Sequence, residues 1–400
     1  MTTQTLKKIP YGRQWIGKEE IRAVTEVLKS DFLTQGTKVP EFEKALARKV
    51  GSDYAVAVAN GTAALHLAAI AVGLKPGDEV ITTPISFLAT SNAIIYAGAK
   101  PIFADIDPET QCMDPRNIES KITKRTRAIF VTDFAGHPAD MAVIYDIARK
   151  HKLKIVEDSA HALGSVYGGS RIGSCRYADM TIFSFHPVKH ITTGEGGAIT
   201  TNDTQLCEKL CELRTHGVTR DPQKLLNKKQ GGWYYEMQSL GFNYRLTDIQ
   251  AAIGIEQLKK SNRFIERRRE IAKKYTRVFS SLPGISTPVE RSDMKHVYHL
   301  YVIRLCGKLT GKRQIFFEQL HKRGIGAQVH YIPIPEQPYY RSLGYRGQDC
   351  PKAQNYYHSA ISLPMYPGLT NTEVNSVIKV VKDISQRIFK QCNGDLNEKK

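Results

Sequence analysis

The sequence predicts an α/β protein with a mostly parallel sheet of about seven strands, followed by a smaller α+β region. Between residues 50 and 202, short runs rich in β-branched residues alternate with segments of helical spacing. This alternation is typical of a parallel sheet covered by helices on both faces. The chain has 400 residues, more than the roughly 250–300 that one hydrophobic core usually supports, so a second region is expected.

The strands of the predicted sheet are short apolar runs bounded by turn residues. They are Ala55–Val58, Glu79–Thr83, Pro101–Asp105, Ala128–Thr132, Lys154–Glu157, Met180–Ser184 and Ala198–Thr201. Segments with helical spacing or helix-start residues lie between them: Thr62–Val72, Phe87–Ala97, Asn117–Lys121 and Ala139–His151.

A long helix is predicted after the sheet. Thr247 followed by Gln250 forms a capping box, and Leu282-Pro283-Gly284 ends the helix near Ser280. We expect the boundary between the regions along this helix, with residues 1–260 forming the N-terminal segment and large domain and residues 261–400 the small domain.

The smaller region has its own predicted elements. Strands are expected at Val297–Leu305 and Gly326–Ile332, and helices at Lys312–Arg323 and Thr372–Gln391. Residues 218–240 are rich in Lys, Gln, Gly and Tyr without a regular period, which indicates an excursion or hairpin.

The composition predicts that the chain does not span a membrane. Hydrophobic residues make up 41% and charged residues 24% of the chain, and no apolar run approaches the roughly 20 residues of a spanning helix. The first residues contain lysines but no apolar stretch behind them, so we expect a cytoplasmic protein.

The formal net charge of +18 admits an anionic partner such as a nucleic acid, an anionic lipid or a phosphorylated small molecule. A solvated helix face and a charged tail also account for much of it, through Arg267, Arg268, Arg269, Lys273, Lys274, Lys399 and Lys400. A nucleic-acid-binding protein is one alternative, although the sequence has no zinc-finger spacing, RNP-like aromatic motif or basic arm. Affinity for nucleic acid that falls steeply with salt would support that alternative.

The cysteines give no sign of a metal site. Their number is odd and no C-x-x-C pair occurs, so we interpret them as reduced thiols and expect no metal. Their positions are Cys112, Cys175, Cys207, Cys211, Cys306, Cys350 and Cys392.

The chemistry should lie where the strands end, because ligands of open α/β sheets bind outside the carboxyl ends of the strands. Asn60-Gly61-Thr62 follows a strand and enters a helix, where free N–H groups and the helix dipole favour a phosphate. By itself this pattern also fits an ordinary capped turn.

Two ionisable residues follow neighbouring strands. Asp158 could hold a cationic ring nitrogen, or serve as a salt-bridge partner or helix cap. Lys189 lies five positions after Ser184 and just before the glycine-rich Thr193-Gly194-Glu195-Gly196-Gly197. A buried lysine with a lowered pKa forms Schiff bases, whereas an isolated lysine is more often a surface residue.

Several segments, in the same order along the chain, resemble sugar aminotransferases of the DegT/DnrJ/EryC1/StrS family, which are fold-type I pyridoxal-phosphate enzymes. The resemblance extends from Tyr11 to about Pro364. The matching segments are Leu33-Thr34-Gln35-Gly36, Thr82-Thr83-Pro84-Ile85-Ser86-Phe87, Glu157-Asp158-Ser159-Ala160-His161-Ala162-Leu163-Gly164, Phe183-Ser184-Phe185-His186-Pro187-Val188-Lys189 with the residues through Gly197, and Gly241-Phe242-Asn243-Tyr244-Arg245-Leu246.

The resemblance implies a role for each matching residue. Lys189 would form the Schiff base with pyridoxal phosphate and move the proton, and Asp158 would hold the pyridine nitrogen. Gly61, Thr62 and Ser184 would bind the phosphate, and Phe87 would stack on the ring. His161 stands where many relatives have Gln. Asn243 would reach the cofactor of a neighbouring subunit, which implies a homodimer with shared sites.

The resemblance also implies a substrate. The segments His190–Thr193 and His321–Tyr331 are most similar to family members of pseudaminic acid biosynthesis, which transfer an amino group from L-glutamate to C4 of a UDP-linked 4-keto-6-deoxy-N-acetylhexosamine. Contacts with the nucleotide sugar would come from Tyr11, Asp31, Phe32, Leu33, Thr34, Gln328, Val329, His330 and Tyr331. His330 and Tyr331 could instead pack at the domain junction.

Two enzymatic alternatives lie within the same fold. A sugar dehydratase of this family has histidine in place of the Schiff-base lysine, so Lys189 argues against it. An aminotransferase for a 3-keto or non-acetylated sugar would need the same Lys189 and Asp158, and therefore stays open.

Overall fold

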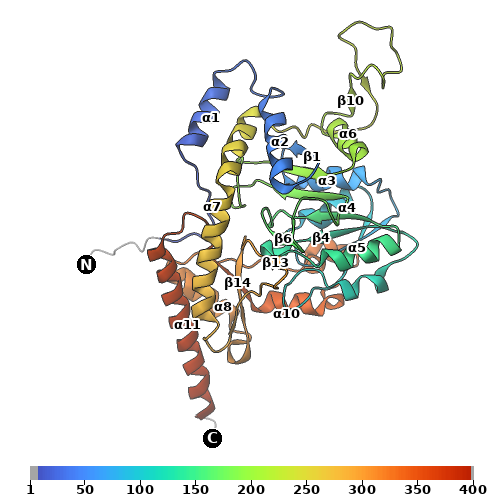
Figure 1. Ribbon diagram of the computed structural model, residues 1–400. Helices are drawn as coiled ribbons and strands as arrows, with labels where there is room; N and C mark the ends of the chain where they lie inside the picture. The colour runs from blue at the N-terminus through green and yellow to red at the C-terminus, as the bar shows by residue number, and fades with distance from the viewer. Residues whose placement is uncertain (1–7, 398–400) are drawn as a thin grey trace.

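The computed structural model describes residues 8–397, and the side chains of residues 8–391. Its centre is a seven-stranded sheet in the order β1-β9-β8-β5-β4-β2-β3 (Figure 1). The strands are β1 (Tyr54–Val58), β2 (Glu79–Thr82), β3 (Lys100–Phe103), β4 (Thr126–Thr132), β5 (Lys154–Asp158), β8 (Met180–Ser184) and β9 (Gly197–Thr201). All seven predicted strands are confirmed to within two residues at each end.

The sheet is mostly parallel, as predicted. Strands β3, β2, β4, β5 and β8 pair in parallel, whereas β9 is antiparallel to both β8 and β1. The carboxyl ends of β1, β4, β5 and β8 therefore lie along one edge of the sheet.

Helices cover both faces because successive side chains of each strand point to opposite sides. Val80, Phe130 and Val156 face the cluster formed with α3 (Gly61–Ala71), α4 (Ala89–Tyr96) and α6 (Thr204–Leu213). Ile81, Ile129 and Ile155 face the cluster that includes α5 (Met141–Lys150). The segment Asn117–Lys121, expected to be helical, forms only two short 3₁₀ turns at Pro115–Asn117 and Glu119–Lys121.

The long helix α7 (Asp248–Phe279) runs from the large sheet to the C-terminal region (Figure 1). The predicted capping box is present: Gln250 N–H donates to Thr247 Oγ1, and the Gln250 side chain reaches back to the Thr247 N–H. The helix packs against α1 (Lys18–Leu28) and α2 (Lys38–Val50) near its start and against α11 (Asn371–Asn397) farther along. The division of the chain at residue 260 stays a prediction.

The C-terminal region contains a three-stranded antiparallel sheet of β12 (Ile285–Ser286), β14 (Tyr301–Leu305) and β15 (Ala360–Leu363). Helix α8 (Arg313–Lys322) confirms the predicted helix, α11 includes all of the predicted closing helix, and α9 (Pro338–Ser342) and α10 (Pro351–Ser359) lie between α8 and β15.

Two strand predictions in this region need correction. The strand expected at Val297–Leu305 begins only at Tyr301, because Tyr298 has a positive φ of 50° that breaks the extended backbone. Gly326–Ile332 is not a strand. Only Gln328 pairs with Ser362, while the Gly326 N–H donates to Ile9 and the Ala327 N–H to His321, so no ladder continues.

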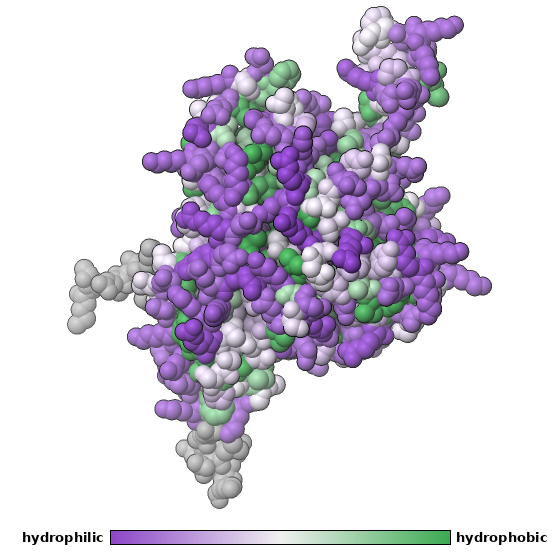
Figure 2. Space-filling model, in the orientation of Figure 1, coloured by the Kyte–Doolittle hydropathy of each residue, from purple (hydrophilic) through white to green (hydrophobic). Residues whose placement is uncertain are grey.

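Residues 218–240 form an arm that projects from the body, as Figures 1 and 2 show. Strands β10 (Val218–Thr219) and β11 (Glu236–Met237) pair antiparallel at its base, so the predicted hairpin is confirmed. A further small sheet joins β13 (Met294–Lys295), β6 (Val166–Tyr167) and β7 (Ser170–Arg171).

Within residues 8–397, none of the helices has the length and apolar character needed to cross a membrane. The six cysteines whose side chains are described are free thiols. The Cys392 side chain, Lys399 and Lys400 lie outside the described residues.

Candidate active site

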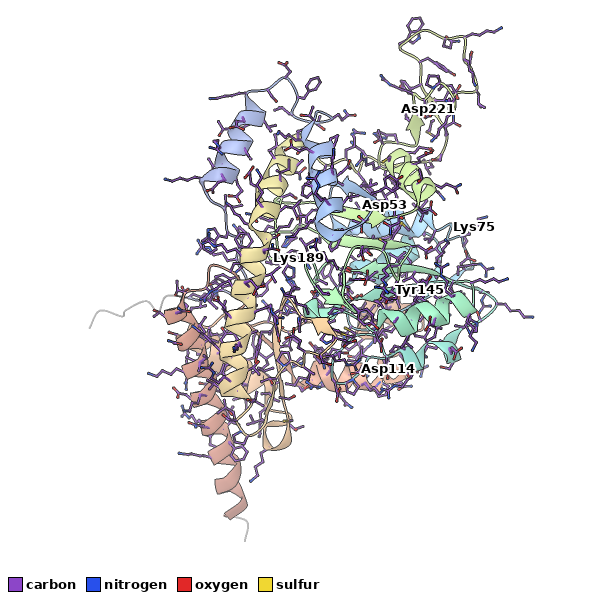
Figure 3. The ribbon with its side chains drawn as sticks, viewed as in Figure 1. Asp53, Lys75, Asp114, Tyr145, Lys189 and Asp221 are labelled. Atoms are coloured by element: carbon purple, nitrogen blue, oxygen red, sulfur yellow. The ribbon has the colours of Figure 1, made fainter. Side chains whose placement is uncertain are left out.

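A cavity of about 790 Å³ opens at the carboxyl ends of the strands. Figure 3 labels Lys189, which lines this cavity, near the middle of the view. Residues from the whole sheet edge line the cavity, including Gly61, Thr62, Phe87, Asp158, His161, Ser184, Lys189, Tyr11, His330 and Tyr331. The tertiary structure thus gathers ten predicted site residues around one space.

The start of α3 forms one wall of the cavity. Asn60 caps the helix by accepting the Ala63 N–H at 2.8 Å, which leaves N–H groups at Gly61 and Thr62 outside the intrahelical ladder. A Cβ at Gly61 would lie 2.9 Å from the Ser184 Cβ, so only glycine permits this approach. N–H groups at a helix start beside two hydroxyl side chains have the chemistry that binds phosphate.

Asp158 ends β5 inside the cavity wall and is buried. Thr90 Oγ1 donates to its Oδ2 at 2.5 Å, and the Ala160 N–H donates to its Oδ1 at 3.2 Å. Burial raises the pKa of Asp158, while these two donors and the charge of Lys189 oppose the rise. A protonated pyridine nitrogen would give this buried carboxylate the cationic partner that burial demands.

Lys189 is held by a tight loop between β8 and β9. The Phe185 N–H donates to Gly196 O at 2.8 Å and the Thr193 N–H donates to Phe185 O at 3.0 Å, which folds the loop back on itself. Burial lowers the pKa of Lys189 to about 8, and the charge of Asp158 opposes this shift. An amine with this pKa is partly unprotonated near neutral pH, as a nucleophile requires.

His161 also lines the cavity and is neutral, because burial and the nearby charge of Lys189 lower its pKa well below the usual value. Its Nδ1 accepts the Ala135 N–H at 3.3 Å, so the ring proton belongs on Nε2, which lies 3.3 Å from the Tyr331 hydroxyl. The His299 ring packs 4.3 Å from the His161 ring, centroid to centroid.

The mouth of the cavity is aromatic. The Phe87 ring is 57% exposed and lies 6.1 Å from the Tyr331 ring, and the Tyr11 ring lies 5.7 Å from the His330 ring. His330 Nδ1 is 2.8 Å from Ser362 Oγ, and burial lowers the pKa of His330 to about 4. The mouth therefore offers aromatic faces against which a flat ring can pack.

Seven predicted site residues do not line this cavity: Asp31, Phe32, Leu33, Thr34, Gln328, Val329 and Asn243. The segment 31–34 and Asn243 are exposed to solvent. Gln328 uses its backbone to pair with Ser362.

Several lining residues were not foreseen from the sequence, among them Tyr96, Thr132, His186, Glu195, Tyr244 and His299. Tyr244 belongs to the Gly241–Leu246 segment, so that motif already pointed to it. His299 comes from the C-terminal region, and only the dense run of rings in His296-Val297-Tyr298-His299 could have suggested it.

Known proteins share this arrangement over nearly the whole chain. The model of the DegT/DnrJ/EryC1/StrS aminotransferase family matches residues 14–382. The spore coat polysaccharide biosynthesis protein SpsC of Bacillus subtilis is 43% identical over 94% of this chain and 97% of its own length. A UDP-4-amino-4,6-dideoxy-N-acetyl-β-L-altrosamine transaminase of Campylobacter jejuni is 38% identical over 96% of this chain and 100% of its own.

A solved structure agrees as well. Helicobacter pylori PseC, an aminotransferase of pseudaminic acid biosynthesis, superposes with a TM-score of 0.89 at 36% identity and covers 95% of this chain and 100% of its own. The fold and the family match define a transferase of the class that requires pyridoxal phosphate. The chain belongs to the DegT/DnrJ/EryC1/StrS family and is a sugar aminotransferase.

Proposed function

We propose that this enzyme transfers the amino group of L-glutamate to C4 of a UDP-linked 4-keto-6-deoxy-N-acetylhexosamine, the amination step of pseudaminic acid biosynthesis. The observation that carries the aminotransferase chemistry is the placement of Lys189, Asp158 and the start of α3 around one cavity. The sugar is supported by similarity to the altrosamine transaminase and to PseC.

Different residues of this chain would hold the phosphate, the ring and the ring nitrogen of the cofactor. The N–H groups of Gly61 and Thr62, with the hydroxyls of Thr62 and Ser184, bind the cofactor's phosphate. Phe87 stacks on its ring, and His161, whose ring nitrogens contact Ala135 and Tyr331, lies beside it. Asp158 holds the ring nitrogen, and Thr90 and Ala160 keep its carboxylate turned toward the cavity.

Lys189 Nζ binds the cofactor and then acts as the base and acid. Bound pyridoxal phosphate supplies an electron sink for the bond that is deprotonated. With the cofactor bound, Lys189 Nζ would move a proton between a carbon of the substrate and a carbon of the cofactor. Its pKa of about 8 suits both directions near neutral pH, because a proton carrier works best with a pKa close to the operating pH.

The sugar enters past Tyr11, His330 and Tyr331. The Tyr331 hydroxyl is paired with His161 and the His330 ring with Ser362, so both rings are held in place before the substrate arrives. Preorganised groups of this kind orient a substrate without a further cost in entropy.

We propose a homodimer with shared sites, and the composition of the cavity lining supports this proposal. Among its described lining residues, Lys189 is the only Lys or Arg, yet a UDP-sugar carries a diphosphate. Asp31–Thr34 and Asn243 lie outside the cavity, and the projecting arm carries Arg220, Lys228 and Lys229. We place these groups at the cavity of a second copy, with Asn243 reaching the phosphate of that copy's cofactor.

A second candidate differs only in the sugar. SpsC, at 43% identity, is named for spore coat polysaccharide biosynthesis and not for pseudaminic acid, so an aminotransferase for another nucleotide-linked keto sugar, 3-keto or non-acetylated, is the second candidate. Lys189 and Asp158 would act identically on it.

The test has two stages. Purified protein is loaded with pyridoxal phosphate, and its visible spectrum is recorded before and after L-glutamate. We expect glutamate to convert the cofactor to its amino form. The product is then offered the 4-keto acetamido sugar, a 3-keto isomer and a non-acetylated analogue, all UDP-linked. A preference for the 3-keto or the non-acetylated sugar would favour the second candidate over the proposed substrate. An unchanged spectrum after L-glutamate would show that glutamate is not the amino donor.

A further inference from the structure

Two buried carboxyl groups lie outside the cavity lining, next to Asp158. Glu157 precedes Asp158 on β5, so its side chain points to the opposite face of the sheet. Asp133 follows the end of β4, the strand paired with β5. Exposure is 4% for Glu157 and 0% for Asp133, and the two carboxyl groups lie within hydrogen-bonding reach of each other.

Asp133 behaves as an acceptor on both oxygens. Its Oδ1 accepts the Ala139 N–H at 2.8 Å, and its Oδ2 accepts the Ser159 hydroxyl at 2.6 Å. Glu157 Oε2 accepts the Thr181 hydroxyl at 2.8 Å. Two ionised carboxylates cannot hydrogen-bond to each other, because neither has a proton to donate.

We propose that Glu157 and Asp133 form a carboxyl pair that holds one proton, with protonated Glu157 donating to ionised Asp133, and that the pair positions the strand ends that carry Asp158 and His161. The pair then keeps a single negative charge behind the cavity. Every donor and acceptor described above is satisfied in this arrangement.

Burial and mutual repulsion support this assignment. Burial, followed by the charge of Asp133, raises the pKa of Glu157 well above its usual value. Burial also raises the pKa of Asp133 to about 7, but the Ser159 and Ala139 donors act against that rise. Two adjacent carboxyl groups in a buried site share one proton for the same reason.

Asp133 links the pair to the site. Its backbone N–H donates to Asp158 O at 3.1 Å, and its side chain holds Ser159, the next residue. The Ala139 N–H closes the turn that starts at Asp133, and Ala135 within that turn donates to His161 Nδ1. Asp133 and Glu157 are therefore positioning residues, not catalytic ones.

Other ionisable groups face the pair from the neighbouring elements. Asp158 acts on Asp133 through its charge. The Cys112 thiol lies near Asp133 and the Cys175 thiol near Glu157, and burial raises the pKa of both thiols. Neutral thiols leave the charge of the pair unchanged at neutral pH.

The first experiment uses the protein without cofactor. We would record the infrared difference spectrum between the wild type and Glu157→Gln at pH 8, in the carbonyl-stretching region of protonated carboxylic acids. The exposed Glu109→Gln serves as the matched control. We expect a protonated-acid band that only Glu157→Gln removes. Absence of that band would overturn the proposal, because both carboxyl groups would then be ionised.

The second experiment tests positioning and rests on the proposed cofactor site. The visible spectrum of the cofactor-loaded protein is titrated with pH for the wild type, Glu157→Gln and the double variant Asp133→Asn/Glu157→Gln. Glu157→Gln keeps the charge of Asp133 and should titrate as the wild type does. The double variant removes the negative charge, which disfavours protonation near Lys189. The proton-binding constant of the lysine-bound cofactor should therefore fall by about two- to fivefold, and the midpoint of the titration should move to lower pH.

The outcomes separate the two proposals. An unchanged midpoint in the folded double variant would contradict the influence of the pair on the site. Absence of any lysine-bound cofactor spectrum in the wild type would contradict the proposed function, yet the infrared band would still decide whether the pair holds a proton.

Discussion

Polar side chains in the cavity have hydrogen-bond partners within the chain, whereas large apolar side chains at the outer ends of the molecule are exposed. In the cavity, Asp158, His161 and His330 all have partners within the chain. On α1, the loop after it and the arm, large apolar side chains are exposed instead, namely Ile21, Leu28, Phe32, Leu33, Leu226, Trp233, Met237 and Leu240. One chain thus completes the part of the site that surrounds Lys189 and leaves apolar surface available at its ends.

This difference has a physical reason. Catalytic groups must be fixed before the substrate arrives, and side chains of a packed sheet edge provide that rigidity. Exposed apolar surface favours association, because covering it releases water. The comparison predicts that changes in the cavity abolish chemistry within one chain, whereas changes at the ends act across chains.

The largest effect is expected from Lys189→Ala. Loss of proton transfer alone should reduce turnover by roughly 10²–10⁴-fold, and the lysine-bound cofactor spectrum should disappear. Lys75→Ala, an exposed lysine also labelled in Figure 3, is the control and should leave both unchanged. Steady-state assays and absorbance spectra measure this, and a Lys189→Ala enzyme with full turnover would contradict the assigned role.

A smaller loss is expected from Asp158→Asn. The amide keeps the shape but lacks the charge that holds a ring nitrogen, and removing one member of a buried pair costs about 3 kcal/mol, roughly a hundredfold in rate. The exposed Asp53→Asn is the matched control. If the cofactor spectrum and rate of Asp158→Asn equal those of the wild type, Asp158 does not contact the ring.

The division between cavity and ends can be tested by mixing two inactive variants. We expect Lys189→Ala and Asn243→Ala each to be impaired alone. If Asn243 acts in the neighbouring cavity, half of the randomly exchanged dimers contain one intact site, so about a quarter of wild-type activity should return. No recovery on mixing, once subunit exchange has been verified, would place Asn243 in its own chain's site.

The smallest effect concerns pH. The pKa of Lys189 is lowered to about 8, so the reactive amine increases as pH rises through that value. The rate at which the cofactor-free protein takes up pyridoxal phosphate should rise from pH 7 to 9 and level off above. A rate that keeps climbing toward the ordinary lysine pKa would indicate an unperturbed amine. The sign for stability is the same: the folded protein releases this proton first, so stability rises between about pH 8 and 10.5.

The regular elements were predictable where local pattern and burial agree. The buried runs of β4 and β5 and the Thr247 cap of α7 appear as expected. Prediction failed at Gly326–Ile332, whose alternation resembles a strand although its N–H groups bond to Ile9 and His321. Ile9 is distant in the sequence, and His321 accepts through its side chain. The local alternation of residues contains no information about such partners.

The sequence by itself determined the family, the sheet and the candidate residues beside the strand ends, because strand alternation, helix caps and motif order are local properties. Only the tertiary structure decided which candidates share a cavity. It brought His299 and Tyr331 beside His161, excluded Asp31–Thr34 and Asn243, and joined Glu157 to Asp133 behind Asp158. These contacts join residues distant in the chain, and their pKa shifts depend on a burial that exists only after folding.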